Sequence, residues 1–148
     1  MIKRSTKNST RGSAALEFAV SSMLLMSLVI FTFRFGYSFY AYNKLEAAVA
    51  AGARYASRRS YDSATNTPSA AFQTAVANTV VYGDPAGGTE PVVPGLSMNN
   101  VQLTVTLDRS VPLQTRVSIV DYNLWALTDW RLSGKPFAEF RYMGRFAP

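Results

Sequence analysis

Gly12, Ser13 and Glu17 are the residues whose types and spacing could do chemistry. Glu17 is an acid within residues 16–33, a segment that is otherwise apolar except for three serines and one threonine. Cleavage between Gly12 and Ser13 would create a free ammonium group at Ser13, and Glu17 would become the fifth residue of the shortened chain. In low dielectric, that ammonium on one copy could pair with Glu17 of the next, and losing either charge would be strongly unfavourable. Such a pair would set the register of an assembly.

A simpler alternative remains open for Glu17. The residue lies only about 6 Å along a helix from Ser13, near the start of the apolar segment. A carboxylate at that depth can extend to the lipid headgroups without any protein partner. Under this alternative, Glu17 is tolerated and has no role in assembly.

The element that positions these residues is a predicted membrane helix, residues 13–34. From Ser13 to Phe33 a helix would extend about 31 Å, close to the ~30 Å hydrocarbon core of a bilayer. A cleaved secretory signal peptide would have a shorter apolar region and a small-x-small site directly after Phe33. The sequence has neither feature, which favours an anchor.

Basic residues concentrate just before the anchor. Residues 1–12 carry four of the fifteen Lys and Arg residues and no acid, whereas 11 basic and 9 acidic residues follow from Ser13 onward. Lys and Arg beside an apolar segment mark the cytoplasmic side. We therefore expect an unstructured cytoplasmic leader at 1–12 and export of residues 35–148. The net charge of +6 belongs mainly to the leader, so a nucleic-acid partner is not expected.

The helix should continue beyond the membrane. Residues 35–59 contain no proline and are rich in alanine, the best helix former, so residues 14–58 are predicted to form one continuous helix. Tyr37, Tyr40 and Tyr42 cluster where an interfacial aromatic belt would lie. Alanine and glycine occupy 47, 48 and 50–53 and allow close approach of another element. Val49 and Tyr55 in the same stretch favour packing over a freely exposed helix.

Residues 60–148 are predicted to form a small exported domain, which makes the fold class α+β. Its expected elements are a helix at 68–82 capped by Thr67, strands at 101–108, 111–119 and 136–143, and a short helix or irregular lid at 124–132. The strands alternate apolar and polar residues, which is typical of a half-buried antiparallel sheet. Arg109-Ser110 is the expected turn between the first two strands.

The residue types argue against an enzyme. The chain contains no cysteine and no histidine, which removes thiol nucleophiles, the commonest general base and the usual zinc ligands. No spacing among the acids selects a catalytic pair. We therefore expect no catalytic residue, no cofactor and no metal.

Several motifs resemble a known family. Residues 12–18, Gly-Ser-Ala-Ala-Leu-Glu-Phe, resemble the prepilin-peptidase site of type IV pilin-like proteins. The longer pattern consists of residues 11–19, Phe35-Gly36, Tyr40-Ala41-Tyr42 and residues 50–56. It is similar to the TadE-like family, pseudopilins of the tight-adherence (Flp, type IVc pilus) system. Two positions differ from the common pilin pattern: Met23 stands where proline is frequent, and Ser13 stands where many type IV pilins have Phe.

The resemblance implies a pilin-like fold and processing between Gly12 and Ser13 by a membrane aspartyl prepilin peptidase. It implies assembly through Glu17 with other pilin-like subunits and the inner-membrane assembly platform. The expected location is the bacterial inner membrane, then the cell surface or pilus after assembly. The expected function is a membrane-anchored pseudopilin or minor pilin-like subunit of a tight-adherence pilus or related secretion apparatus.

Two other functions remain open at this point. The first is an uncleaved single-span protein whose exported domain binds a partner or a cell-envelope ligand. The second is an exported enzyme, which the missing His, Cys and motifs disfavour.

Overall fold

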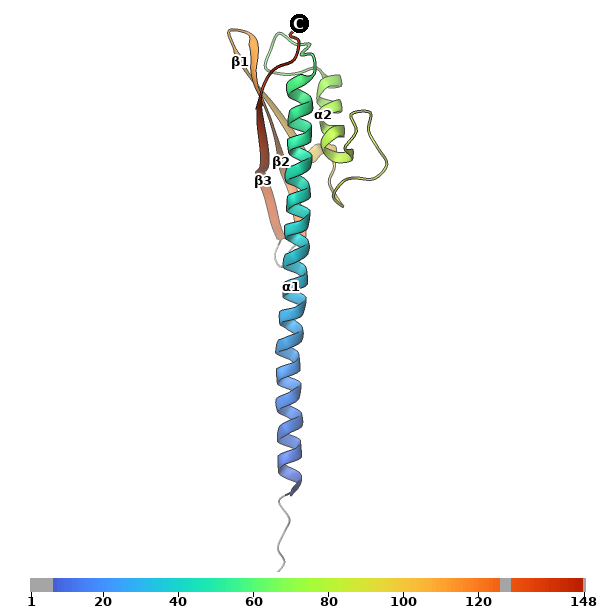
Figure 1. Cartoon of the computed structure of the whole chain (residues 1–148), viewed down its shortest axis with the longest axis vertical. Helices are drawn as coiled ribbons and strands as arrows, with labels where there is room; N and C mark the ends of the chain where they lie inside the picture. The colour runs from blue at the N-terminus through green and yellow to red at the C-terminus, as the bar shows by residue number, and fades with distance from the viewer. Residues whose placement is uncertain (1–6, 126–128, 148) are drawn as a thin grey trace, which may run out of the picture.

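One long helix organises the molecule. The computed structural model describes residues 7–125 and 129–147. Helix α1, Lys7–Arg58, has 52 residues and is about 78 Å long. In Figure 1 its lower half stands alone and its upper half carries every other element. The predicted continuous helix over 14–58 is confirmed.

The leader differs from the expectation in part. Residues 1–6 lie outside the described residues, but α1 already begins at Lys7, so the unstructured leader was wrong for residues 7–12. Once a long helix exists, adding a residue fixes the backbone dihedral angles of that residue alone and gains one hydrogen bond, without a new nucleation step. The polar residues before Gly12 therefore extend the helix although their own helix propensity is low.

A second helix and a β-sheet pack against the upper half of α1. Helix α2, Ala70–Tyr82, lies on one side of α1, and a sheet lies on the other (Figure 1). The sheet is antiparallel in the order β1-β2-β3, with β1 at Val101–Asp108, β2 at Val111–Trp125 and β3 at Asp129–Arg141. A short 3₁₀ helix, Met98–Asn100, precedes β1. The α+β fold with two helices and a three-stranded antiparallel sheet is confirmed.

The core forms where α1 meets these elements. Buried residues come from the upper half of α1, from α2, from β2 and from the loop before β1: Leu45, Val49, Ala53, Phe72, Val76, Val80, Leu96, Val117 and Ile119. Gly52 faces α2, and a Cβ at this position would collide with the side chain of Val80. The small residues of α1 therefore permit close packing, as the sequence indicated.

The two hairpins of the sheet differ in how well the sequence predicted them. Strand β1 has the predicted bounds, and Arg109 and Ser110 form its turn, with φ of 47° and 65°. Two consecutive positive φ values match the turn type that suits strand twist.

The predicted short helix or lid at 124–132 was wrong for the described residues. Strand β2 continues to Trp125 and β3 begins at Asp129, so this part is the far end of a long hairpin. Register shifts at 118–122 break the alternation that marks a strand in the sequence. Pairing between the buried Tyr122 and Leu132 nevertheless holds the hairpin together.

Ser69 caps helix α2. The prediction that Thr67 is the cap was wrong. The Ser69 hydroxyl accepts a hydrogen bond from the Phe72 backbone N–H at 3.2 Å and donates one to a carboxylate oxygen of Asp62 at 2.6 Å. This second bond lowers the pKa of Asp62 below its usual range. Asp62 thus orients the cap across the loop that joins the two helices.

The Asp62 contact predicts a dependence of stability on pH. Because the folded-state pKa is lowered, the stabilisation is fully present above the unfolded pKa of about 3.9 and is lost as the pH falls through the folded value. Asp62→Asn should destabilise the protein by about 0.5 kcal/mol at neutral pH, a small effect because the group is exposed. Urea unfolding of both proteins at pH 7 and pH 3 tests this, and a difference as large at pH 3 would contradict it.

The end of β3 is tied to the end of α1. The Tyr142 hydroxyl lies 2.8 Å from the carbonyl oxygens of Arg59 and Arg145, and it accepts from the Tyr61 N–H at 2.9 Å. Tyr61 and Phe146 form a parallel bridge. Burial raises the pKa of both Tyr61 and Tyr142, so both hydroxyls stay protonated and can donate at neutral pH.

Candidate functional site: the exposed half of the first helix

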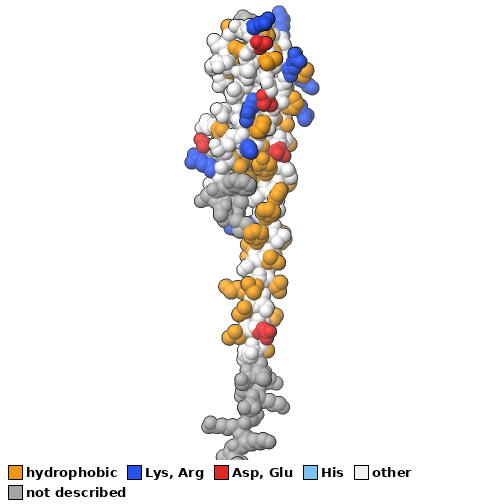
Figure 2. Space-filling model, turned by 90° about the vertical axis from the view of Figure 1, so that its left-hand side faces the viewer, with side chains coloured by type: hydrophobic (Ala, Val, Ile, Leu, Met, Phe, Trp, Pro, Cys, Tyr) orange, Lys and Arg blue, Asp and Glu red, His pale blue; other side chains and the backbone are white. Residues whose placement is uncertain are grey.

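The lower half of α1 presents an apolar surface on all sides. Its large hydrophobic side chains between Leu16 and Phe33 are about half to three quarters exposed. Figure 2 shows hydrophobic side chains along this half, and most of the charged groups that it colours gather over the domain formed by α2, the sheet and the upper half of α1. The helix is long and apolar enough to cross a membrane, and its most apolar stretch is not buried against the rest of the structure. A surface of this kind needs lipid or other helices around it.

The three predicted site residues all lie on this half of α1. Gly12, Ser13 and Glu17 are exposed, and the peptide bond between Gly12 and Ser13 lies within the helix. Ser13 and Glu17 are four residues apart and so share one face of α1, one turn apart. A neighbouring helix that docks on this face would meet both residues. Among the side chains that the structure describes, Glu17 has no hydrogen bond and no ion pair.

Several hydroxyl groups of this segment are satisfied within the helix. The side chains of Ser27, Thr32 and Ser38 donate to the backbone carbonyls of Met23, Leu28 and Arg34, each four residues earlier, at 2.8–2.9 Å. These bonds remove the need for a polar partner in lipid. Glu17 cannot be satisfied in this way, because an ionised carboxylate only accepts hydrogen bonds.

Aromatic residues mark the junction between the exposed half and the domain. Phe31, Phe35 and Phe39 form a ladder at helical spacing, with ring centroids 6.0 Å and 4.8 Å apart. Ser38 and Ala41 are the first buried residues of α1. The tyrosine cluster predicted as an interfacial belt lies at this junction.

A pocket that the sequence did not predict lies at this junction between the exposed half of α1 and the domain. It lies between Tyr37–Lys44 of α1 and the loop at 90–94, which follows α2. The tyrosines signalled an interface, and the prolines signalled a loop. No pattern in the sequence placed the two side by side.

Comparison with known families adds one finding. A family model described as TadE-like protein matches residues 12–54. This segment is TadE-like. Searches of curated proteins and of solved structures returned no match.

The TadE-like segment covers both the exposed apolar half of α1 and most of its packed half. It starts at Gly12, contains Glu17 and ends at Arg54, four residues before the end of α1. The resemblance drawn from motifs between residues 11 and 56 is therefore confirmed over residues 12–54. Helix α2 and the sheet lie outside the matched residues.

Proposed function

We propose that this chain is a membrane-anchored, pseudopilin-like subunit in the assembly of a tight-adherence pilus or a related secretion apparatus. The lower half of α1 spans the inner membrane with its amino end in the cytoplasm, and residues 35–148 are exported. The proposed role is structural and not enzymatic. Its partners are a prepilin peptidase, other pilin-like subunits, the inner-membrane assembly platform and the lipid bilayer.

One observation carries the proposal: Glu17, which has no partner among the described side chains, lies on the apolar surface of a TadE-like helix, on the same face as Ser13. Cleavage between Gly12 and Ser13 removes the basic leader and places an ammonium group beside that carboxylate. Two opposite charges on one face give a neighbouring copy a complementary pair in low dielectric. A simple anchor gains nothing from this arrangement.

Processing gives the first test. We expect the native chain to begin at Ser13 in cells that contain the prepilin peptidase and at Met1 in cells that lack it. Gly12→Val should prevent cleavage and leave the fold intact, because a Cβ at Gly12 would meet no atom within 4 Å. Intact-mass measurement of the purified chain distinguishes these forms.

Gly36→Val is the matched control for this test. A Cβ at Gly36 also meets no atom within 4 Å, and Gly36 lies on the same helix, 24 residues beyond Gly12. This variant should be processed like the unmodified chain. A chain that begins at Met1 in the presence of active peptidase would contradict the proposal and favour the uncleaved anchor.

A further inference from the structure

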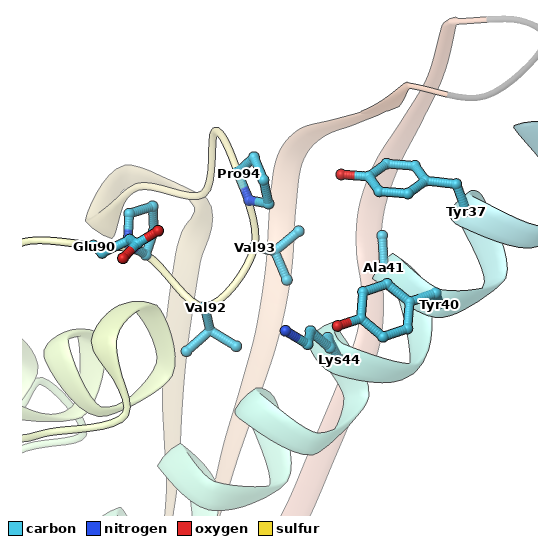
Figure 3. A pocket seen from close by; sticks show the side chains of 9 residues that line it. Tyr37, Tyr40, Ala41, Lys44, Glu90, Val92, Val93 and Pro94 are labelled. Atoms are coloured by element: carbon cyan, nitrogen blue, oxygen red, sulfur yellow. The ribbon is translucent and has the colours of Figure 1, made fainter.

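The pocket between α1 and the loop at 90–94 has a volume of about 240 Å³. Its lining comprises Tyr37, Tyr40, Ala41 and Lys44 from the helix, and Glu90, Pro91, Val92, Val93 and Pro94 from the loop. Figure 3 shows the hydroxyl groups of Tyr37 and Tyr40 pointing from α1 toward the loop. The pocket therefore combines an apolar floor with polar groups from two separate elements.

The loop side of the pocket is fixed in place. The Val92 N–H donates to the Val81 carbonyl at 2.7 Å, and the Tyr122 hydroxyl donates to the Pro94 carbonyl at 2.8 Å. Val93 is only 2% exposed and belongs to the core. The pocket is thus formed in advance, which lowers the free energy needed to order it around a ligand.

Two opposite charges line the pocket without neutralising each other. Lys44 comes from the helix and Glu90 from the loop, and the structure describes no ion pair between them. The Lys44 ammonium lies 5.0 Å from the centroid of the Tyr40 ring, one turn nearer the membrane segment. This direction is expected, since helical side chains lean toward the amino end of their helix. Lys44 therefore brings its charge down toward the membrane.

The end of the pocket nearest Arg34 lies at the level of the lipid headgroups if residues 13–34 span the bilayer, with Tyr37 inside the headgroup layer and Tyr40 just above it. Tyr37 and Tyr40 are then about 4.5 Å and 9 Å above Arg34. The hydrocarbon core is about 30 Å thick and the whole bilayer about 40–45 Å, which leaves a headgroup layer of roughly 5–7 Å on each side. Headgroups are consequently the most concentrated ligands at the mouth of the pocket.

We propose that this pocket binds the headgroup of a phospholipid that carries a primary ammonium group, the phosphoethanolamine class. The lipid phosphate accepts hydrogen bonds from the Lys44 ammonium and the tyrosine hydroxyls, and the lipid ammonium donates to the Glu90 carboxylate. A trimethylammonium headgroup has no N–H to donate to Glu90. An anionic headgroup without an ammonium would leave Glu90 facing negative charge. The inference rests on the membrane anchor of the proposed function.

The test uses the full-length chain in nanodiscs that contain equal amounts of phosphatidylethanolamine, phosphatidylglycerol and phosphatidylcholine. Native mass spectrometry of the released protein counts the retained lipids. We expect at least fivefold preference for phosphatidylethanolamine over each of the other two lipids. Lys44→Gln should reduce retention of phosphatidylethanolamine about fivefold. Glu90→Gln should abolish its preference over phosphatidylglycerol.

Two exposed residues of β3 provide matched controls, Lys135→Gln for the lysine and Glu139→Gln for the glutamate. Both should retain lipids like the unmodified protein. Equal retention of the three lipids, or pocket variants that behave like these controls, would overturn the inference and leave the anchor standing. Recovery of the protein outside the nanodisc fraction would instead overturn the anchor, and the headgroup site with it.

Discussion

Glu17→Gln should lower the incorporation of this subunit into assembled structures by about a hundredfold. Glutamine has nearly the same shape but no charge, so the Ser13 ammonium of the processed neighbour would be left in low dielectric without its partner. Breaking a buried ion pair costs roughly 3 kcal/mol at the lower end, which corresponds to about a hundredfold in an association constant. Insertion and processing should be unaffected or improved, because the variant removes a charge from the anchor.

Fractionation into membrane-bound and sheared, assembled material measures this effect. Glu46→Gln is the matched control, since Glu46 is an exposed acid of the same helix beyond the membrane segment. It should assemble like the unmodified protein. Normal assembly of Glu17→Gln would contradict the role of Glu17 in register and would favour a carboxylate that only reaches the headgroups.

Gly52→Ala should destabilise the domain that packs on the upper half of α1 by about 2 kcal/mol. The new methyl group would collide with Val80, which is fully buried in the interface between α1 and α2. Valine in a helix has one strongly preferred rotamer, so its side chain cannot easily turn away. Overpacking of this kind costs up to about 3 kcal/mol, and the better helix propensity of alanine offsets about 1 kcal/mol. The melting temperature should fall by roughly 4–8 °C.

Thermal unfolding followed by near-ultraviolet circular dichroism reports on the domain and not on the exposed half of α1. Gly36→Ala is the control, because this glycine also lies on α1 but a Cβ there meets no atom within 4 Å. It should be neutral or slightly stabilising. Gly52→Ala combined with Val80→Ala should lose less stability than the sum of the single variants. A Gly52→Ala protein as stable as Gly36→Ala would contradict the close packing of the helices.

The sequence predicted the elements whose signal is local. A long apolar segment followed by an alanine-rich one indicated α1, and strict alternation over 101–108 indicated β1. It did not predict the pairing of β2 with β3 beyond residue 119, since register shifts at 118–122 remove the alternation. The cap of α2 depends on Asp62 across a loop, a contact that no local pattern contains.

The candidate site also has one part that the sequence indicated and one part that it did not. Gly12, Ser13 and Glu17 lie close together in sequence on one helix, so their spacing alone was informative. The pocket joins Lys44 to Glu90, residues 46 positions apart, through the packing of a loop on α1. A site of that kind becomes visible only when the tertiary contacts are known.

The hydrogen bonds that join Tyr142 to Tyr61 and to the end of α1 determine where a label can be attached. They hold the tail at the tip of the molecule, at the opposite end from the exposed apolar half of α1 (Figure 1). Phe146 and Ala147 take part in the bridge to Tyr61, so an epitope or fluorescent tag needs a flexible linker after Ala147. Such a tag would extend away from the exposed half of α1 and would not cover its apolar surface. Imaging through this position can therefore follow the subunit without disturbing the helix that we propose drives its assembly.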